Sequence, residues 1–167
     1  MNIAYYPNKL LLIPTIPVAE HEFGTPALNQ TIDEMFILMH KMKGVGLAHN
    51  QTIGGNKNIF VVKLDGNREV FINFKILLKD FEPKEMTESK ESCLSLPGID
   101  PVLKYRFKTI ETEYRTIGGE KKLENIGGFK AIVIQHEFFH ILGKTIICDL
   151  PRLKRQILAK KIQKFVK

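Results

Sequence analysis

Apolar side chains recur at helical spacing in the N-terminal part of the chain. From Ala27 to Met42 they stand three or four positions apart, at Leu28, Ile32, Met35, Phe36, Met39 and Met42. A stripe with this period buries one face of a helix, so the pattern predicts an amphipathic helix over Ala27–Met42. The methionines of the stripe are interpreted as core side chains rather than as metal ligands.

The pattern changes after this helix to short apolar or alternating runs that are typical of strands. These runs are Ile59–Leu64, Val70–Leu78 and Phe107–Arg115. A turn at Asp65-Gly66-Asn67 joins the first two runs, and Gly118-Gly119 marks a hairpin turn after the third. The polar stretch Leu77–Ser92 shows no clear period, so it is expected to form a strand end and a loop.

The most apolar helical segment of the chain carries two histidines and a glutamate. His136-Glu137-Phe138-Phe139-His140 is preceded by Gly127-Gly128 and the apolar residues 131–134, and followed by Ile141. Two imidazoles four positions apart on one helix face can bind a divalent metal, and the neighbouring carboxylate can deprotonate a water. The alternative is a core helix whose histidines form hydrogen bonds to the backbone.

A metal site of this type needs a third protein ligand. One metallopeptidase pattern continues with a glycine and a third histidine; Gly143 is present, but Ile146 occupies the histidine position. The other candidates are His21, His40, His49 and Cys93 upstream, with Cys148 a weaker one downstream. Cys93 stands in a turn-rich segment, and a thiolate with two imidazoles suits Fe(II), Zn or Co. Its alternative role is that of a small buried hydrophobe.

Three segments together suggest a family. They are Gly44-Val45-Gly46-Leu47-Ala48-His49-Asn50-Gln51, Glu91-Ser92-Cys93-Leu94-Ser95 and Gln135–His140. Alone, the first segment indicates only a helix C-cap and a turn. In this order and spacing, however, the three resemble the G-x-G-L-A-A-x-Q, E-G-C-L-S and Q-H-E-x-x-H motifs of the peptide deformylases. The resemblance covers nearly the full length, which predicts a single domain over residues 1–167.

The resemblance implies a ligand set and a substrate site. Cys93, His136 and His140 would hold one divalent metal, Fe(II) in the cell, with Zn, Ni or Co as substitutes. Glu137 would take a proton from the attacking water, while the Gln51 side chain and the Leu94 backbone N–H would stabilise the oxyanion. The substrate would contact two pairs of residues, Val45 and Gly46 through their backbone and Ile132 and Val133 in a methionine pocket.

The implied activity is removal of the formyl group from N-formylmethionine at the start of nascent polypeptides. A formyl carbonyl is small enough to reach a recessed metal that would exclude a larger acyl group. Two other hypotheses remain at this stage. One is a catalytically weak protein that binds peptide N-termini, and the other is a metallopeptidase based on the H-E-x-x-H pattern alone.

Four positions depart from the family pattern. His49 replaces the second alanine of the first motif, and Ser92 replaces the glycine before the cysteine. Phe139 replaces an aspartate that commonly ties the ligand helix to a basic residue, for which Tyr105 and Arg106 lie near the expected place. Asp100 stands where bacterial enzymes often have arginine. Because no ligand is lost, the chain is expected to be an active but divergent member.

Composition adds limits to this interpretation. The chain has 167 residues, of which 44% are hydrophobic, enough for one sizeable core. No apolar run approaches the length of a membrane span, and the N-terminal residues do not form a signal peptide. Two cysteines, one of them a candidate ligand, argue against disulfides and for a reducing compartment. We therefore expect a cytoplasmic location of the bacterial type, or an organelle.

Positive charge is concentrated at the C-terminus. The net charge is +7, and residues 152–167 hold seven basic side chains and no acid, so the remainder is neutral. Apolar residues in the same segment follow a helical stripe, and Pro151 can begin the helix.

Together with the helices and strands above and the family resemblance, this segment completes a predicted α+β fold, with small antiparallel sheets around the metal-binding helix and a basic C-terminal helix. The basic side of this C-terminal helix is either simply solvent-exposed or binds a polyanion. The resemblance favours ribosomal RNA as that polyanion, and a membrane surface is a weaker option.

Overall fold

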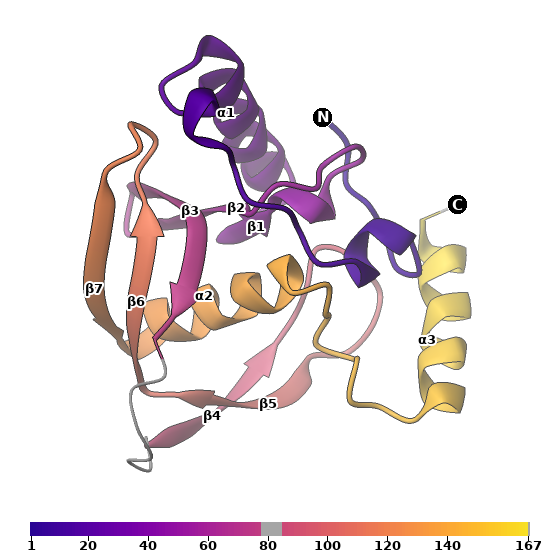
Figure 1. Cartoon of the computed structure of the whole chain (residues 1–167). Helices are drawn as coiled ribbons and strands as arrows, with labels where there is room; N and C mark the ends of the chain where they lie inside the picture. The colour runs from indigo at the N-terminus through magenta and orange to yellow at the C-terminus, as the bar shows by residue number, and fades with distance from the viewer. Residues whose placement is uncertain (78–84, 167) are drawn as a thin grey trace.

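The computed structural model describes residues 1–77 and 85–166 (Figure 1). Its α-helices are α1 (Pro26–Lys41), α2 (Gly128–Ile141) and α3 (Arg152–Phe165), and its 3₁₀ helices are η1 (Lys9–Leu12), η2 (Glu20–Glu22) and η3 (His49–Gln51). Its strands are β1 (Gly46–Ala48), β2 (Ile59–Leu64), β3 (Asn67–Ile76), β4 (Met86–Glu91), β5 (Val102–Phe107), β6 (Thr109–Arg115) and β7 (Lys121–Gly127). The predicted α+β class is confirmed.

Helix α1 matches the predicted amphipathic helix to within one residue at each end. The Thr25 side chain accepts a hydrogen bond from the Leu28 N–H and caps the first turn, and Pro26 suits the first helical position. At the other end Lys43, rather than a glycine, takes the left-handed conformation with φ of 56°. The methionines Met35 and Met39 are buried, as expected of a core stripe.

Strands β1, β2, β3, β6 and β7 form one antiparallel sheet in the order β1-β2-β3-β6-β7. Strand β2 has the predicted bounds. Strand β3 begins earlier than predicted because Asp65 and Gly66, both with positive φ, make the whole turn and let Asn67 pair with Leu64. The predicted end of this strand at Leu78 lies outside the described residues.

Strands β4 and β5 form a second, two-stranded antiparallel sheet, and here the sequence predictions were wrong. The stretch predicted as a strand end and loop contains β4. Its inward positions are Thr87, Ser89 and Glu91, so burial alternates along the strand although hydrophobicity does not. Phe107, predicted to begin the third strand, instead ends β5, and β6 starts at Thr109.

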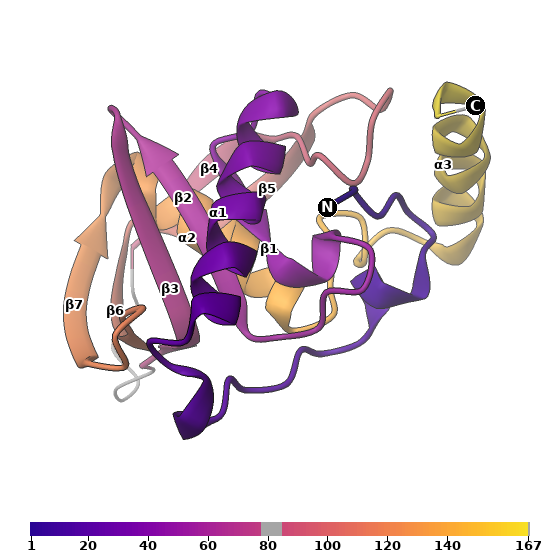
Figure 2. The same ribbon diagram turned by 90° about the horizontal axis from the view of Figure 1, so that it is seen from above.

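Helix α2 crosses the molecule between the two sheets (Figures 1 and 2). It packs against β1, β2, β6 and β7 of the large sheet and against β5 of the small one. Its apolar residues Ala131, Val133 and Ile134 join a core with the aromatic side chains of β2 and β3. The histidine-bearing face is therefore held between the sheets, away from bulk water.

Helix α3 lies at the edge of the molecule, apart from both sheets (Figures 1 and 2). Ile162 is buried with Leu96 and Ile147, whereas Leu153 and Ile157 are 70% and 59% exposed. The basic helix is confirmed, but only part of its apolar stripe packs on the body. Within the described residues no helix is long and apolar enough to cross a membrane, and both cysteines are free.

Candidate metal centre and active site

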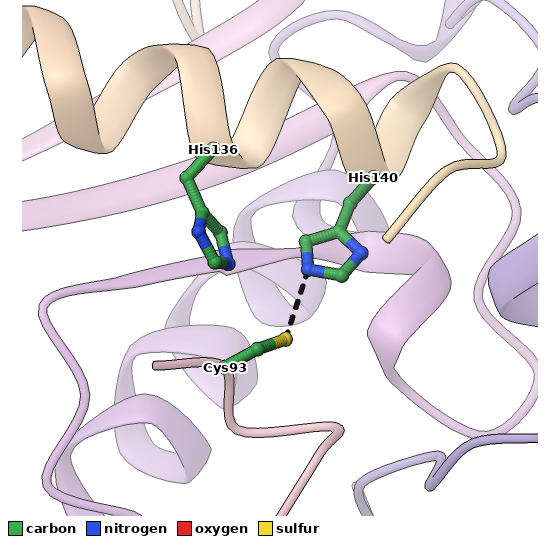
Figure 3. A group of neighbouring side chains, drawn as sticks. All are labelled: Cys93, His136 and His140. Atoms are coloured by element: carbon green, nitrogen blue, oxygen red, sulfur yellow. Dashed lines mark hydrogen bonds between the residues drawn. The ribbon is translucent and has the colours of Figure 1, made fainter. Parts of the chain in front are cut away.

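Cys93, His136 and His140 meet at one point between α2 and the loop after β4 (Figure 3). Their ligand atoms lie within 4.8 Å of one another, and Cys93 Sγ is 3.2 Å from His140 Nε2. Helical spacing places the two imidazoles on the same side of α2, and the loop brings the thiol opposite them. One sulfur and two nitrogen donors at this separation fit a divalent ion such as Zn or Fe(II).

The two histidines sit in different electrostatic surroundings. Burial, together with the neighbouring His136 and Arg106, lowers the pKa of His140 well below its usual value and keeps that ring neutral. Burial also acts to lower the pKa of His136, but Cys93 and Glu91 outweigh it and raise this pKa to about 10. The neutral His140 ring has a nitrogen lone pair available for a metal, whereas His136 must give up its proton before it can bind one.

Glu91 supports the site, a role that sequence reasoning did not assign. Its carboxylate accepts hydrogen bonds of 2.7 Å from Arg106 Nε and from Arg106 Nη2, and Glu91 Oε2 lies 2.9 Å from His136 Nδ1. Burial acts to raise the Glu91 pKa, but the bonds from Arg106 and His136 lower it to about 2. A charged carboxylate on Nδ1 orients the ring and leaves Nε2 for the metal.

Arg106 is the basic partner whose presence the sequence left open. Its side chain is 2% exposed, and its guanidinium carbon lies 4.6 Å above the centre of the Phe139 ring. Phe139 therefore stacks on the arginine that an aspartate at that position could have bound. Among the described residues, Glu91 supplies the compensating charge.

Glu137 points from α2 toward β1. A side chain at Gly46 would place its Cβ only 2.4 Å from Glu137 Oε1, so a larger residue there would displace this carboxylate. Glu137 Oε2 is buried and has no hydrogen-bond partner among the described residues. Burial raises the Glu137 pKa to about 7, a value suited to accepting and returning a proton near neutral pH.

The Gln51 amide is fixed at both ends. Its Oε1 accepts a hydrogen bond of 2.8 Å from the Ala48 N–H, which leaves Nε2 as the group that faces the ligands. Nε2 donates to Ser95 Oγ at 3.2 Å and lies 3.6 Å from Cys93 Sγ. An oriented amide N–H beside the metal site can donate to an oxygen that becomes negatively charged.

A cavity of about 320 Å³ opens onto these groups. Nine of the ten residues predicted for the site line it: Val45, Gly46, Gln51, Cys93, Leu94, Ile132, Val133, His136 and Glu137. His140 does not line it but completes the ligand group.

The other ligand candidates lie elsewhere. Among the described residues, His21, His40, His49 and Cys148 take no part in the only cluster suited to a metal. The partly buried His49 ring accepts a hydrogen bond from the Lys57 N–H at 3.3 Å and so faces a loop rather than the ligands. Of the other departures, Ser92 lines the cavity and Asp100 is exposed.

The family model for polypeptide deformylase matches residues 1–156. The chain belongs to this family. It is 36% identical to a peptide deformylase from Chromobacterium violaceum over 98% of this chain and 95% of that protein. The crystal structure of a deformylase from Ehrlichia chaffeensis superposes with a TM-score of 0.87 at 28% identity, covering 99% of this chain and 96% of the other.

A further structural neighbour, the Met-Ala-Ser-bound class I type b deformylase of Acinetobacter baumannii, gives a TM-score of 0.81 at 27% identity, with 88% of this chain and 96% of the other covered. Family membership makes this chain a metal-dependent hydrolase that removes the N-formyl group from nascent peptides. The metallopeptidase and the weak peptide-binding hypotheses are not favoured.

Proposed function

We propose that the chain is an active enzyme of one domain in which the ten predicted residues carry out deformylation. The observation that supports this most strongly is the convergence of Cys93, His136 and His140 beside the cavity, which Cys93, His136, Glu137 and Gln51 line. A divalent metal held there supplies a Lewis acid that acidifies a water and polarises a carbonyl. The direct test is formate release from a formylated peptide by the metal-loaded protein.

Glu137 acts as the proton carrier in this proposal. Its Oε2, which has no partner among the described residues, can accept the proton of the attacking water, and the same carboxyl can then donate that proton to the departing amine of methionine. Between these two steps the former carbonyl oxygen of the tetrahedral intermediate carries negative charge. Gln51 Nε2 and the Leu94 backbone N–H are the donors assigned to it.

The peptide is proposed to pair with the free edge of β1. Among the described strands, β1 pairs only with β2. Val45 and Gly46 were both expected to pair with the peptide through their backbone. The Val45 carbonyl accepts the Lys63 N–H of β2, so by the alternation of antiparallel strands the outward backbone groups belong to Gly46, and Gly46 is proposed to make this pairing. An extended peptide can add to such an edge. Its methionine side chain would enter the part of the cavity lined by Ile132 and Val133.

Gln51→Ala is expected to lower kcat by about 10²- to 10³-fold with a small change in KM, because the amide acts on charge that develops in the transition state. Steady-state kinetics on a formyl-methionyl tripeptide measure both constants. Ser95→Ala removes a hydrogen bond of the same amide at 3.2 Å while keeping the donor, and serves as the matched control. A Gln51→Ala enzyme with a normal kcat would remove Gln51 from the mechanism.

The metal in the cell is proposed to be Fe(II), with Zn, Ni or Co as substitutes. A mixed thiolate and imidazole site accepts all four ions, so the donor set alone does not select among them. Activity that decays in air and returns when the protein is reloaded with Ni or Co would support an oxidisable iron centre. Protein purified without oxygen should then contain iron in proportion to its activity.

Helix α3 is proposed to bind ribosomal RNA, which would place the enzyme beside emerging chains in the cytoplasm of a bacterium or in an organelle. Lys160, Lys161 and Lys164 are exposed on it. Replacing all three by glutamate is expected to abolish salt-sensitive ribosome binding and to leave kcat/KM on small peptides unchanged.

Sedimentation with ribosomes at several salt concentrations measures this effect. The control replaces Lys41, Lys63 and Lys122, exposed lysines of α1, β2 and β7, by glutamate. This variant has the same net charge as the α3 variant. Unaltered sedimentation of the α3 variant, with its fold intact by circular dichroism, would assign the helix to a solvated face.

A further inference from the structure

A buried asparagine ties the metal-ligand helix to the turn that carries Gln51. Asn50, in η3, is 1% exposed. Its Nδ2 donates to the His140 carbonyl at 2.5 Å and lies 3.4 Å from the Leu10 carbonyl in η1. Because both neighbours are carbonyl oxygens, the amino group of the amide must face them.

The bond to His140 falls on the last turn of α2. The carbonyls of a last helical turn lack intrahelical partners and must find donors elsewhere. The His140 carbonyl receives the Gly143 N–H at 2.8 Å and the Asn50 amide. Asn50 thus fixes the backbone of a predicted ligand from outside its own helix.

The same two residues each hold a buried polar atom without a hydrogen-bond partner among the described residues. These atoms are Asn50 Oδ1, an acceptor, and His140 Nδ1. His140 Nε2 faces Cys93 Sγ at 3.2 Å, so a neutral ring with Nε2 free for the metal carries its proton on Nδ1. A buried donor and a buried acceptor, both without partners among the described residues, therefore belong to two residues that are already joined through the His140 carbonyl.

His136 shows what such a ligand requires. Its Nδ1 is bonded to Glu91 Oε2 at 2.9 Å, and this bond fixes both the tautomer and the tilt of the ring. His140 has no carboxylate in the equivalent place among the described residues. Two unsatisfied buried atoms cost free energy unless they find each other or share a water.

We propose that Asn50 is the positioning residue of His140: its Nδ2 holds the ligand's carbonyl, and its Oδ1 receives the Nδ1–H through one bridging water. This inference concerns the metal centre of the proposed function. The asparagine precedes Gln51 directly, so one turn sets both the second histidine ligand and the oxyanion donor. Asn50 acts through His140 and does not line the cavity.

Asn50→Ala is expected to lower metal affinity by about 10- to 100-fold, as the loss of an orienting partner does at other metal sites. The measurement is Zn(II) retention against a chelator, together with the visible spectrum of the Co(II)-loaded protein, which reports ligand geometry. The control is Asn58→Ala, which removes another bond between an asparagine amide and the backbone, the one that Asn58 Oδ1 accepts from the Phe74 N–H at 3.0 Å. Asn58 belongs neither to the ligand cluster nor to the cavity lining. Wild-type Zn(II) retention and Co(II) spectrum in a folded Asn50→Ala protein would overturn the proposal.

A second measurement needs no variant. In zinc-loaded protein with ¹⁵N-labelled histidine, the Nδ1–H protons of His136 and His140 should both be visible and slow to exchange. The His140 proton should lie close to the Asn50 side-chain amide. A His140 proton that exchanges freely, or one that is close to a different acceptor, would contradict the assignment. Neither experiment depends on which amide the enzyme hydrolyses, so failure here is separate from failure of the proposed function.

Discussion

Glu137→Gln is expected to lower formate release by about 10²- to 10⁴-fold while the protein keeps its metal, because an amide cannot accept the proton of the attacking water. Glutamine has the same size as glutamate, so the close contact with Gly46 is preserved. The metal ligands are unchanged, and metal content measured by elemental analysis should equal that of the parent.

The matched control is Glu88→Gln, an exposed position on β4 whose carboxylate contacts only Tyr105 among the described side chains. This variant should retain full activity and metal. If Glu137→Gln instead released formate at a near-normal rate, another group would have to carry the proton. The mechanism proposed above would then be wrong at its central step.

Cys93→Ala is expected to reduce metal content from about one ion per chain to a small fraction, because two imidazoles without the thiolate are a poor site for a divalent ion. Activity should fall with the metal. The chain provides its own control, since Cys148 is the other free cysteine and lies outside the ligand cluster. Cys148→Ala should keep both metal and activity.

The Cys93 result also separates the ligand assignment from general damage to the fold. Cys93 is 8% exposed and packs with Leu96 and Ile162, so its truncation removes some apolar contact. A folded Cys93→Ala protein that has lost its metal supports the assignment. A folded Cys93→Ala protein with full metal and activity would mean that the third ligand lies elsewhere.

The elements with a clear hydrophobic period could be predicted from the sequence. Helix α1 and strand β2 carry their burial pattern in apolar residues, and the structure places them where the pattern did. Strand β4 could not be found this way because its buried end is a charged residue. Glu91 is tolerated inside because Arg106 and His136, which belong to other elements, pair with it.

The candidate site likewise contains residues that the sequence could identify and residues that only the folded structure reveals. Cys93, His136 and His140 could be predicted because three motifs resemble those of the family, and the structure brings them together. The supporting roles of Glu91 and Asn50 depend on atoms that meet only after folding, such as the carbonyl of His140. No local pattern reports a hydrogen bond between residues so far apart in the chain.

The most direct test of the account is the release of formate from formyl-Met-Ala-Ser by the metal-loaded protein. The same reaction should be run beside the unformylated Met-Ala-Ser peptide and a formylated peptide that begins with a residue other than methionine. The account predicts rapid formate release from the first, no cleavage of the second, and slow release from the third because the apolar pocket is left unfilled. Cleavage of peptide bonds in the unblocked peptide, or no formate from a fully metal-loaded protein, would contradict it.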